Sequence, residues 1–443
     1  MRRSALTIFC TLCLTSASAY ATGFDLREFS ASSLGTSYAG AGANGAHAST
    51  MAFNPATLGQ VEDFDMSVST TGVLPTASGN FTTATTAAGT PISGTKTPST
   101  IIPSALIPSI AIRQRLSDQF SIGLSVTVPW GLMTKYDTTW AGRYYANKSE
   151  IKTFNFTPTI AYQPVPWLSF GAGLQVEYIK GNLSKAIDFG TIGYSYHILA
   201  PLYFGADDGA ALLSADNWAY GYVLGVAAKP NDNLSFGLSY RSKVDHLLSG
   251  TETFTPDALH VAATLAAVSG AFVNTAATAK VTMPSVFNAS LRYRLNDKWT
   301  AMTTVDYTGW SAFHQLLAVA ANVHQPADLT TFNWKDSWFA SFGAEYKASD
   351  LWTLRVGTAY DETPTQTVGR TPGIPDSSRK WLSGGVGYRM TDHVDVDFSV
   401  AHLFGGKGAI NQLVSTPENA GRGTLVGSVT TGVTLVGLEL TYR

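Results

Sequence analysis

Thiols are scarce in this chain and are confined to its start. The only cysteines, Cys10 and Cys13, lie in an apolar stretch that follows Arg2 and Arg3. This stretch leads to the small-residue pattern Ala19-Tyr20-Ala21, so residues 1–21 are predicted to be a secretory signal peptide. The mature chain is then expected to begin at Thr22, with neither a disulfide framework nor a thiolate metal site.

Charged residues and long apolar runs are also few. Charged residues make up 14% of the sequence, against roughly 25% in a typical soluble domain. A net charge of −2 without a basic stripe gives no indication of a nucleic-acid partner. No window offers about 20 uninterrupted apolar residues, which excludes a helical membrane protein. An exported chain of this kind is predicted to be a β-barrel, because only helices and closed sheets satisfy their backbones in lipid.

Local signatures of catalysis and of cofactor binding are missing. The eight histidines show no metal-ligand spacing, and there is neither a G-x-S-x-G elbow nor a phosphate-binding glycine loop. We therefore expect no enzyme activity, no metal and no cofactor. An outer-membrane hydrolase that assembles its site across strands stays open as an alternative, and a serine-directed reagent would test it.

Short polar turns alternate strictly with long connections along most of the chain. Thirteen connections predict fourteen antiparallel strands, an even number, with the short turns in the periplasm and the long loops outside. The short turns are 115–119, 163–167, 229–233, 294–299, 347–352 and 389–394. The long connections are roughly 74–104, 129–150, 181–217, 250–280, 310–334, 361–379 and 405–423.

The segments between these turns alternate in polarity. In the stretch from Val394 to Val400, apolar residues alternate with Asp395 and Asp397, which places both carboxylates in the lumen and the apolar side chains in lipid. Aromatic residues at the turns fit an interfacial belt: Trp167, Trp299, Trp352 and Tyr388. A soluble β-sandwich is the alternative, but it would lack the one-sided difference in connection length.

The segment 22–60 does not alternate and is rich in glycine, alanine and serine. Its apolar residues, among them Phe24 and Leu26, give it enough surface to pack. A fourteen-stranded lumen is too wide for side chains alone to fill. We therefore predict that residues 22–60 form a luminal plug, or hatch, and residues 61–443 the transmembrane barrel, rather than that 22–60 is a disordered tail.

Several motifs together resemble the outer-membrane long-chain fatty-acid transporter family, the FadL type that includes the TodX-like toluene-uptake proteins. The similarity covers essentially the whole mature chain. The motifs are Thr22-Gly-Phe24, Ala39-Gly40, Asn54-Pro55-Ala56, Met283-Pro-Ser285, Trp338 to Tyr346, Gly357 to Pro364 and Ile374 to Ser383. The resemblance implies a channel for passive uptake of hydrophobic molecules, most of all long-chain fatty acids.

The family pattern implies external capture and a lateral exit. The stretch Ala258–Val273 is helix-like and strongly apolar for a loop in water. The loops 183–216 and 251–279 would form a capture groove that includes Leu259, Val261 and Phe272. Alternatively, their apolar faces would simply pack on each other.

Pro129-Trp130-Gly131 should break the third strand, because proline cannot donate a hydrogen bond to a neighbouring strand. This position matches the lateral gate of the family. Alternatively, the strand ends at Val128.

Ligand-contacting residues also follow from the resemblance. Lys335 matches a ligand-pocket lysine of the family, and Lys185, or less well Lys180, matches its arginine partner. Phe24 is predicted to be the hatch residue that contacts ligand, while Asn54, Pro55 and Ala56 hold the hatch together.

We expect a monomer in the outer membrane of a Gram-negative bacterium, surrounded by lipid and lipopolysaccharide. Uptake of aromatic or aliphatic hydrocarbons, a general porin for hydrophilic solutes, and an adhesin remain alternatives.

Overall fold

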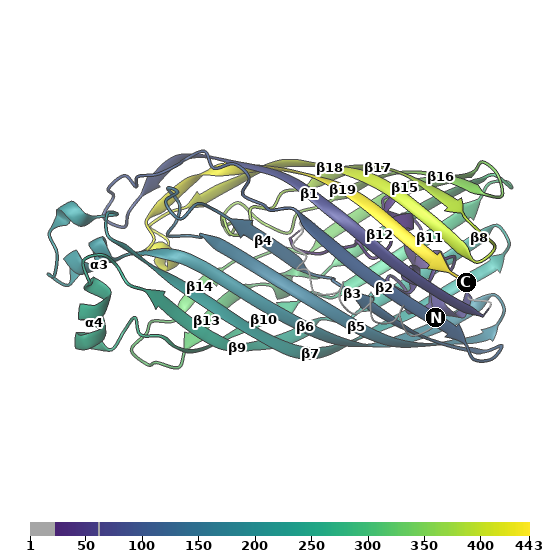
Figure 1. Cartoon of the computed structure of the whole chain (residues 1–443), viewed down its shortest axis with the longest axis horizontal. Coiled ribbons are helices and arrows are strands. Elements are labelled where there is room, and N and C mark those ends of the chain that lie inside the picture. Colours follow the sequence, from purple (N-terminus) through teal and green to yellow (C-terminus); the bar gives the residue numbers. More distant parts are fainter. Residues whose placement is uncertain (1–22, 61–62) are drawn as a thin grey trace, which may run out of the picture.

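The computed structural model describes residues 23–60 and 63–443, so the predicted signal peptide lies outside the described residues. Nineteen strands form one antiparallel sheet that closes where β19 pairs with β1 (Figure 1). Five of the fourteen barrel segments consist of two successive strands, namely β3 with β4, β8 with β9, β10 with β11, β12 with β13, and β14 with β15. The predicted fourteen-stranded barrel with an N-terminal plug is confirmed.

The strands of the barrel are β1 (Phe64–Thr85), β2 (Ala105–Arg115), β3 (Phe120–Thr127), β4 (Gly131–Lys135), β5 (Lys148–Val165), β6 (Leu168–Asp188), β7 (Asp208–Asn231), β8 (Leu234–Arg241), β9 (Val244–Thr255), β10 (Thr275–Met283), β11 (Val286–Arg294), β12 (Trp299–Thr308), β13 (Gln315–Ala320), β14 (Asp328–Thr331), β15 (Ser337–Lys347), β16 (Trp352–Asp361), β17 (Arg379–Arg389), β18 (Val394–Gln412) and β19 (Thr424–Tyr442). The connections carry α3 (Phe189–Ser195), η5 (Pro201–Tyr203), α4 (Val261–Ser269), η6 (Trp310–Ala312) and η7 (Pro417–Asn419). None of the helices among these described residues is both long and apolar enough to cross a membrane.

The predicted alternation of the strands is confirmed in β18. Phe398 and Val400 are exposed on the outer wall, whereas the Asp397 side chain points inward and pairs with Arg355. An outward carboxylate at membrane depth would cost several kcal/mol, so this pairing fixes the register. The same division runs along β6, where Ser169, Gln175 and Glu177 are buried, whereas the buried positions of β7 hold small residues such as Ala219 and Gly225.

The six short turns lie where the sequence predicts them, and the C-terminus lies at that end of the barrel (Figure 1), where Arg443 N–H donates to the His393 carbonyl. At the opposite end the strands are longer than predicted. Strands β6 and β7 stay paired as far as Asp188 and Asp208, so the expected loop 183–216 is wrong at both ends. Because paired backbone continues beyond the polarity pattern, Lys185 belongs to a strand and not to a loop.

Residues 23–60 fill the lumen as a chain of short helices: α2 (Ala31–Leu34), η2 (Ala41–Ala43), η3 (Ala48–Ala52) and η4 (Pro55–Gln60). Leu26, Leu34 and Leu58 have no exposed surface. The small residues between them let the backbone pack close to the wall. We refer to residues 23–60 as the hatch.

Two wall glycines make room for the hatch at Asn54 and Pro55. A Cβ atom on Gly225 of β7 would lie 2.0 Å from Asn54 Oδ1, and one on Gly171 of β6 would lie 2.3 Å from the Pro55 carbonyl carbon. Both distances are far below van der Waals contact. Any side chain at these positions would therefore push the hatch away from the wall.

We predict that Gly225→Val displaces the hatch, because the new side chain overlaps Asn54 and overpacking of this kind costs about 3 kcal/mol. Single-channel recording in planar bilayers should show larger and more frequent ion conductance than in the parent protein. Gly72→Val is the matched control, since its Cβ would meet no atom closer than 3.7 Å. Equal conductance in both variants would contradict this account of the hatch contact.

Candidate functional site

The barrel wall is interrupted in its third segment. Strand β3 pairs with β2 only through residues 121–126, and β4 pairs with β5 but, in the part of the chain that the structure describes, not with β2. Residues 128–130 connect the two strands, so the ladder breaks at Pro129 and the strand resumes at Gly131. The break lies at the predicted position, and the alternative in which the strand ends at Val128 is wrong.

The hatch supplies the backbone partners that the interrupted wall lacks. Leu26 N–H donates to the Pro129 carbonyl at 2.8 Å, and Gly131 N–H donates to the Phe24 carbonyl at 2.9 Å. These bonds enclose an antiparallel bridge between Asp25 and Trp130. The hatch segment 24–26 therefore acts as a short extra strand that seals the break.

Phe24 lies fully buried in a cluster of aromatic side chains. Its ring centroid is 4.7 Å from that of Trp310, 5.1 Å from Phe313 and 5.6 Å from Trp334, with edge-to-face or tilted geometry. Such pairs each add about 1 kcal/mol to the burial of the rings. Phe24 is thus held both by its backbone at the break and by its ring at the opposite wall.

A cavity of about 130 Å³ adjoins this aromatic cluster, because Phe313 and Phe332 belong to both. Its apolar wall includes Leu132, Ile151, Ile179, Leu248, Val281 and Ile374. Five charged side chains also line it: Lys148, Lys185, Glu252, Asp328 and Arg422. A largely apolar cavity with a few convergent charges is the usual form of a small-molecule site.

The two predicted ligand lysines lie in different places. Lys185 lines the cavity and pairs with Asp328 at 2.6 Å. Lys335 lies between β14 and β15, pairs with Glu362 at 2.5 Å, has a side chain that is 48% exposed, and is not among the cavity residues. The structure therefore does not bring Lys335 and Lys185 together, and a ligand role for either stays a prediction.

The loops at the far end of the barrel form a small lobe around α3 and α4 (Figure 1). Val261 is fully buried against Phe189, and the Phe272 ring lies 5.0 Å from the ring of Phe189. Leu259 is 43% exposed and faces outward. Of the three predicted capture residues, Val261 and Phe272 thus pack within the lobe, which agrees with the alternative that the apolar faces of the two loops pack on each other. Leu259 remains accessible.

Buried carboxylates hold this lobe together. Asp257 accepts hydrogen bonds from the backbone N–H groups of Val261 and Ala262 at the start of α4. Asp207 accepts from Ala258 and Leu259. Burial raises the pKa of the Asp207 carboxyl, and its hydrogen bond with Asp257 acts in the same direction.

Asn54 anchors the hatch and does not reach the cavity. Its side-chain amide donates to the carbonyls of Gly42 at 2.7 Å and of Val226 in the wall at 3.0 Å, and its oxygen accepts from Ala56 N–H at 3.0 Å. Pro55 follows as the first residue of η4. The predicted structural role of these three residues agrees with these contacts.

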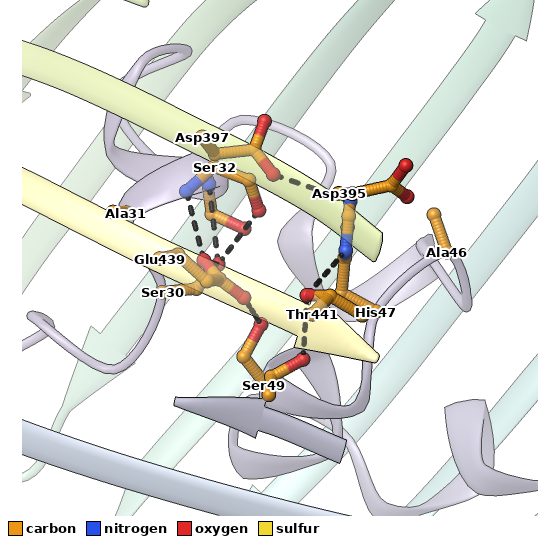
Figure 2. A network of polar contacts seen from close by, with 12 residues as sticks. Ser30, Ala31, Ser32, Ala46, His47, Ser49, Asp395, Asp397, Glu439 and Thr441 are labelled. Atoms are coloured by element: carbon orange, nitrogen blue, oxygen red, sulfur yellow. Dashed lines mark hydrogen bonds and ion pairs between the residues drawn. The ribbon is translucent and has the colours of Figure 1, made fainter. Parts of the chain in front are cut away.

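A network of polar contacts attaches the hatch to β19 (Figure 2). The buried Glu439 carboxylate accepts from Ser30 Oγ at 2.9 Å, from Ser32 N–H at 2.9 Å and from Ser49 Oγ at 2.5 Å. His47 Nδ1 and Thr441 Oγ1 share a hydrogen bond of 2.9 Å. Hydrogen bonds to a charged group are worth about 1.5–3 kcal/mol each, so this network holds the hatch firmly to the last strand.

The described part of the chain contains no group of three or more His, Cys, Asp or Glu side chains arranged to hold a metal ion.

A closed barrel, a sealed break in its wall and an apolar cavity beside the plug define a plugged outer-membrane transport channel. The chain belongs to the family described as outer membrane protein transport protein (OMPP1/FadL/TodX), whose model matches residues 12–443. It is accordingly an outer-membrane transporter of hydrophobic molecules and not an enzyme.

Known relatives match over nearly the full length. The long-chain fatty acid transport protein of Escherichia coli K12 is 27% identical, with 96% of this chain and 97% of the relative covered. A Pseudomonas aeruginosa FadL homologue has a similar crystal structure, with a TM-score of 0.86 at 22% identity over 95% of this chain and 99% of that one. The toluene transporter TodX of P. putida gives a TM-score of 0.67 at 17% identity over 94% and 98%.

Sequence reasoning missed Asp328 and Arg422 in the cavity, Glu439 under the hatch, and the aromatic partners of Phe24. For Glu439 a signal was available, because it is an inward-facing carboxylate in an otherwise uncharged strand and must have a partner. For Asp328 and Arg422 no signal was available, because Asp328 begins the short strand β14, Arg422 lies in the connection before β19, and the sequence does not indicate the course of either segment.

We predict that Glu439→Ala lowers the free energy of unfolding by about 3 kcal/mol, because three donors of the hatch lose a buried charged acceptor. Denaturant unfolding in detergent micelles, followed by tryptophan fluorescence, would measure the change. Glu439→Gln, which keeps the shape and one oxygen acceptor, should lose less than half as much. Unfolding curves of both variants that coincide with the parent curve would contradict the anchoring role.

Proposed function

We propose that this protein takes up long-chain fatty acids by energy-independent diffusion and releases them sideways through the break between β3 and β4. The observation that carries the proposal is that one hatch segment, 24–26, both seals the break and places Phe24 beside the cavity wall. Movement of this segment would therefore open a path from the cavity to the lipid.

The route begins outside the barrel. Apolar side chains on the lobe are exposed to water, including Leu259, Leu202 and Val268, and they would capture an oily molecule. From there the molecule would enter the apolar cavity, because each Å² of apolar surface removed from water gains about 25 cal/mol. Contact with Phe313 or Phe24 would then loosen the hatch segment.

A lateral exit suits such a molecule better than an aqueous pore. A ligand that leaves the cavity for the periplasm would expose its apolar surface to water again, whereas release into the bilayer keeps that surface buried. The hatch also fills part of the lumen, which counts against a general porin. We infer that the barrel works as a monomer surrounded by lipid and lipopolysaccharide.

The substrate class is the first point to test. Cells that lack their own transporter and produce this protein should accumulate labelled oleate, and uptake of toluene is the corresponding test for a hydrocarbon channel. Oleate uptake at least about tenfold above that of cells with an empty vector would support the proposal. Toluene uptake alone would favour the hydrocarbon channel, and sugar or ion passage without either would indicate a porin.

We predict that a disulfide between hatch and break stops transport reversibly. Asp25 and Trp130 form a bridge whose flanking residues make the hydrogen bonds, the close type of antiparallel pair, with Cα atoms about 4.5 Å apart and therefore within disulfide reach. The mature chain is expected to contain no other thiol, so Asp25→Cys with Trp130→Cys should form one defined bond.

The oxidised double variant should fail to take up oleate, and dithiothreitol should restore uptake in the same cells. Each single variant, with and without reductant, controls for the loss of the native side chain. Undiminished uptake by the fully oxidised protein would exclude movement of segment 24–26 as the gating step.

A further inference from the structure

Four lysines gather on the part of the wall where β4, β5 and β6 lie side by side (Figure 1). Lys148 on β5 is directly opposite Lys135 on β4. Lys152, also on β5, is directly opposite Lys180 on β6. Like charges in directly opposed positions destabilise a sheet, so both pairs would gain from an anion placed between them. We refer to these four residues as the outer lysine patch.

The outer lysine patch faces away from the lumen. Ile151 and Ile179, which precede Lys152 and Lys180 in the chain, point inward and line the cavity. Because successive side chains of a strand point to opposite faces of the sheet, Lys152 and Lys180 point outward. All four lysines of the patch are at least partly exposed. Lys180 therefore lies on the outside of the wall and does not reach the cavity.

Acidic side chains neutralise only part of the outer lysine patch. Glu150 lies between Lys148 and Lys152, with its oxygens 2.8 Å and 2.6 Å from their ammonium nitrogens. Asp216 on β7 is opposite Lys180 in the register of the sheet. Among the described residues, the ammonium groups of the other two lysines have neither an ion pair nor a hydrogen bond. Four positive charges thus stand against two negative ones, which leaves the patch able to bind an anion.

The outer lysine patch lies at the outer edge of the membrane. A tilted strand crosses the hydrocarbon layer in about 9–11 residues. Tyr178 is the eleventh residue of β6 after its short turn, and Lys180 follows two residues later on the same face. The ring centroid of Trp218 lies 5.1 Å from that of Tyr178 and 6.1 Å from that of Phe156. Aromatic belts of this kind mark the membrane interface, so the lysines are at the height of the outer head groups.

Below the outer lysine patch, the same part of the wall offers a surface for acyl chains. Exposed apolar side chains of β5 and β6 lie there, among them Ile160, Phe170 and Leu174. A membrane lipid with phosphate groups in its head and several acyl chains would therefore match both parts of this surface. In the outer leaflet of a Gram-negative outer membrane, lipid A, the membrane anchor of lipopolysaccharide, has this chemistry.

We propose that the outer lysine patch binds the phosphate groups of lipid A, with Lys152 and Lys180 as the central pair. A phosphate between these ammonium groups would accept charge-assisted hydrogen bonds from both and relieve their repulsion. Lys152 is also opposite Gly131, where the third segment resumes after the break. The bound lipid would therefore stand beside the break in the wall. This site goes beyond the proposed function and does not depend on it.

The experiment compares lipid A with and without its phosphate groups. Equilibrium binding of each lipid would be measured on the full protein, purified free of lipopolysaccharide in detergent micelles. Lys152→Gln with Lys180→Gln should weaken binding of lipid A about tenfold, which corresponds to roughly one charge-assisted hydrogen bond, and leave binding of the dephosphorylated lipid within about twofold. Lys152→Arg with Lys180→Arg, which keeps both charges, should bind lipid A within about twofold of the parent protein.

Lys229→Gln with Lys347→Gln is the matched control, because it removes the same charge from two short turns at the opposite end of the barrel. Lipid A binding should stay within about twofold of the parent value in this variant, since neither lysine lies in the patch. Heat-modifiable migration on gels would show that each variant is a folded barrel. Equal weakening in both glutamine variants would indicate a general effect of net charge and overturn the assignment.

Inorganic phosphate distinguishes a lipid site from an ordinary anion site. At about a tenfold excess it should not displace lipid A, because it lacks the acyl chains whose burial adds to the affinity. Displacement under these conditions would overturn the assignment to a lipid. Equal binding of phosphorylated and dephosphorylated lipid A by the parent protein would overturn it as well. The uptake of oleate is measured separately, so failure of this proposal would leave the proposed function standing.

Discussion

Backbone hydrogen bonding in a medium without water is the constraint on which this architecture depends. Every unpaired N–H or C=O group at membrane depth costs several kcal/mol, yet the third barrel segment is broken at Pro129. The cost is avoided because segment 24–26 of the hatch lends its own N–H and carbonyl groups to the break, and because Thr153 Oγ1 accepts from Trp130 N–H and donates to the Trp130 carbonyl. Wall and plug are therefore one hydrogen-bonded structure at this point.

The same segment links the wall to the cavity through packing. Phe24 contacts Trp310, Phe313 and Trp334, and Phe313 also lines the cavity. A molecule that enters the cavity must therefore press on side chains that hold the seal in place. Because protein interiors are close-packed, such a displacement passes to Phe24 rather than being absorbed by empty space.

Much of the fold could be predicted from the sequence, and much less of the site. Alternating polarity and the contrast between short and long connections determined the number of strands and the inner and outer faces, as at Asp397 and Phe398. The break could be predicted at Pro129 because proline has no N–H group to donate to a neighbouring strand. The ends of the strands were misjudged, because paired strands beyond the membrane no longer alternate between lipid and lumen, and Lys185 was placed in a loop for that reason. Asp328 and Arg422 escaped prediction because they are far from Lys185 in sequence, and the three side chains meet only when the barrel closes.

The attachment of the hatch to Glu439 and Thr441 has a consequence for assembly. The hatch precedes the whole barrel in the chain, whereas its polar anchor is in β19, the last strand in chain order. Ser30, Ser32 and Ser49 can find their acceptor only once β19 has joined the sheet. This attachment must therefore form last, so a half-inserted molecule could hold its hatch only through the contacts with earlier strands, such as that of Asn54 with Val226 of β7.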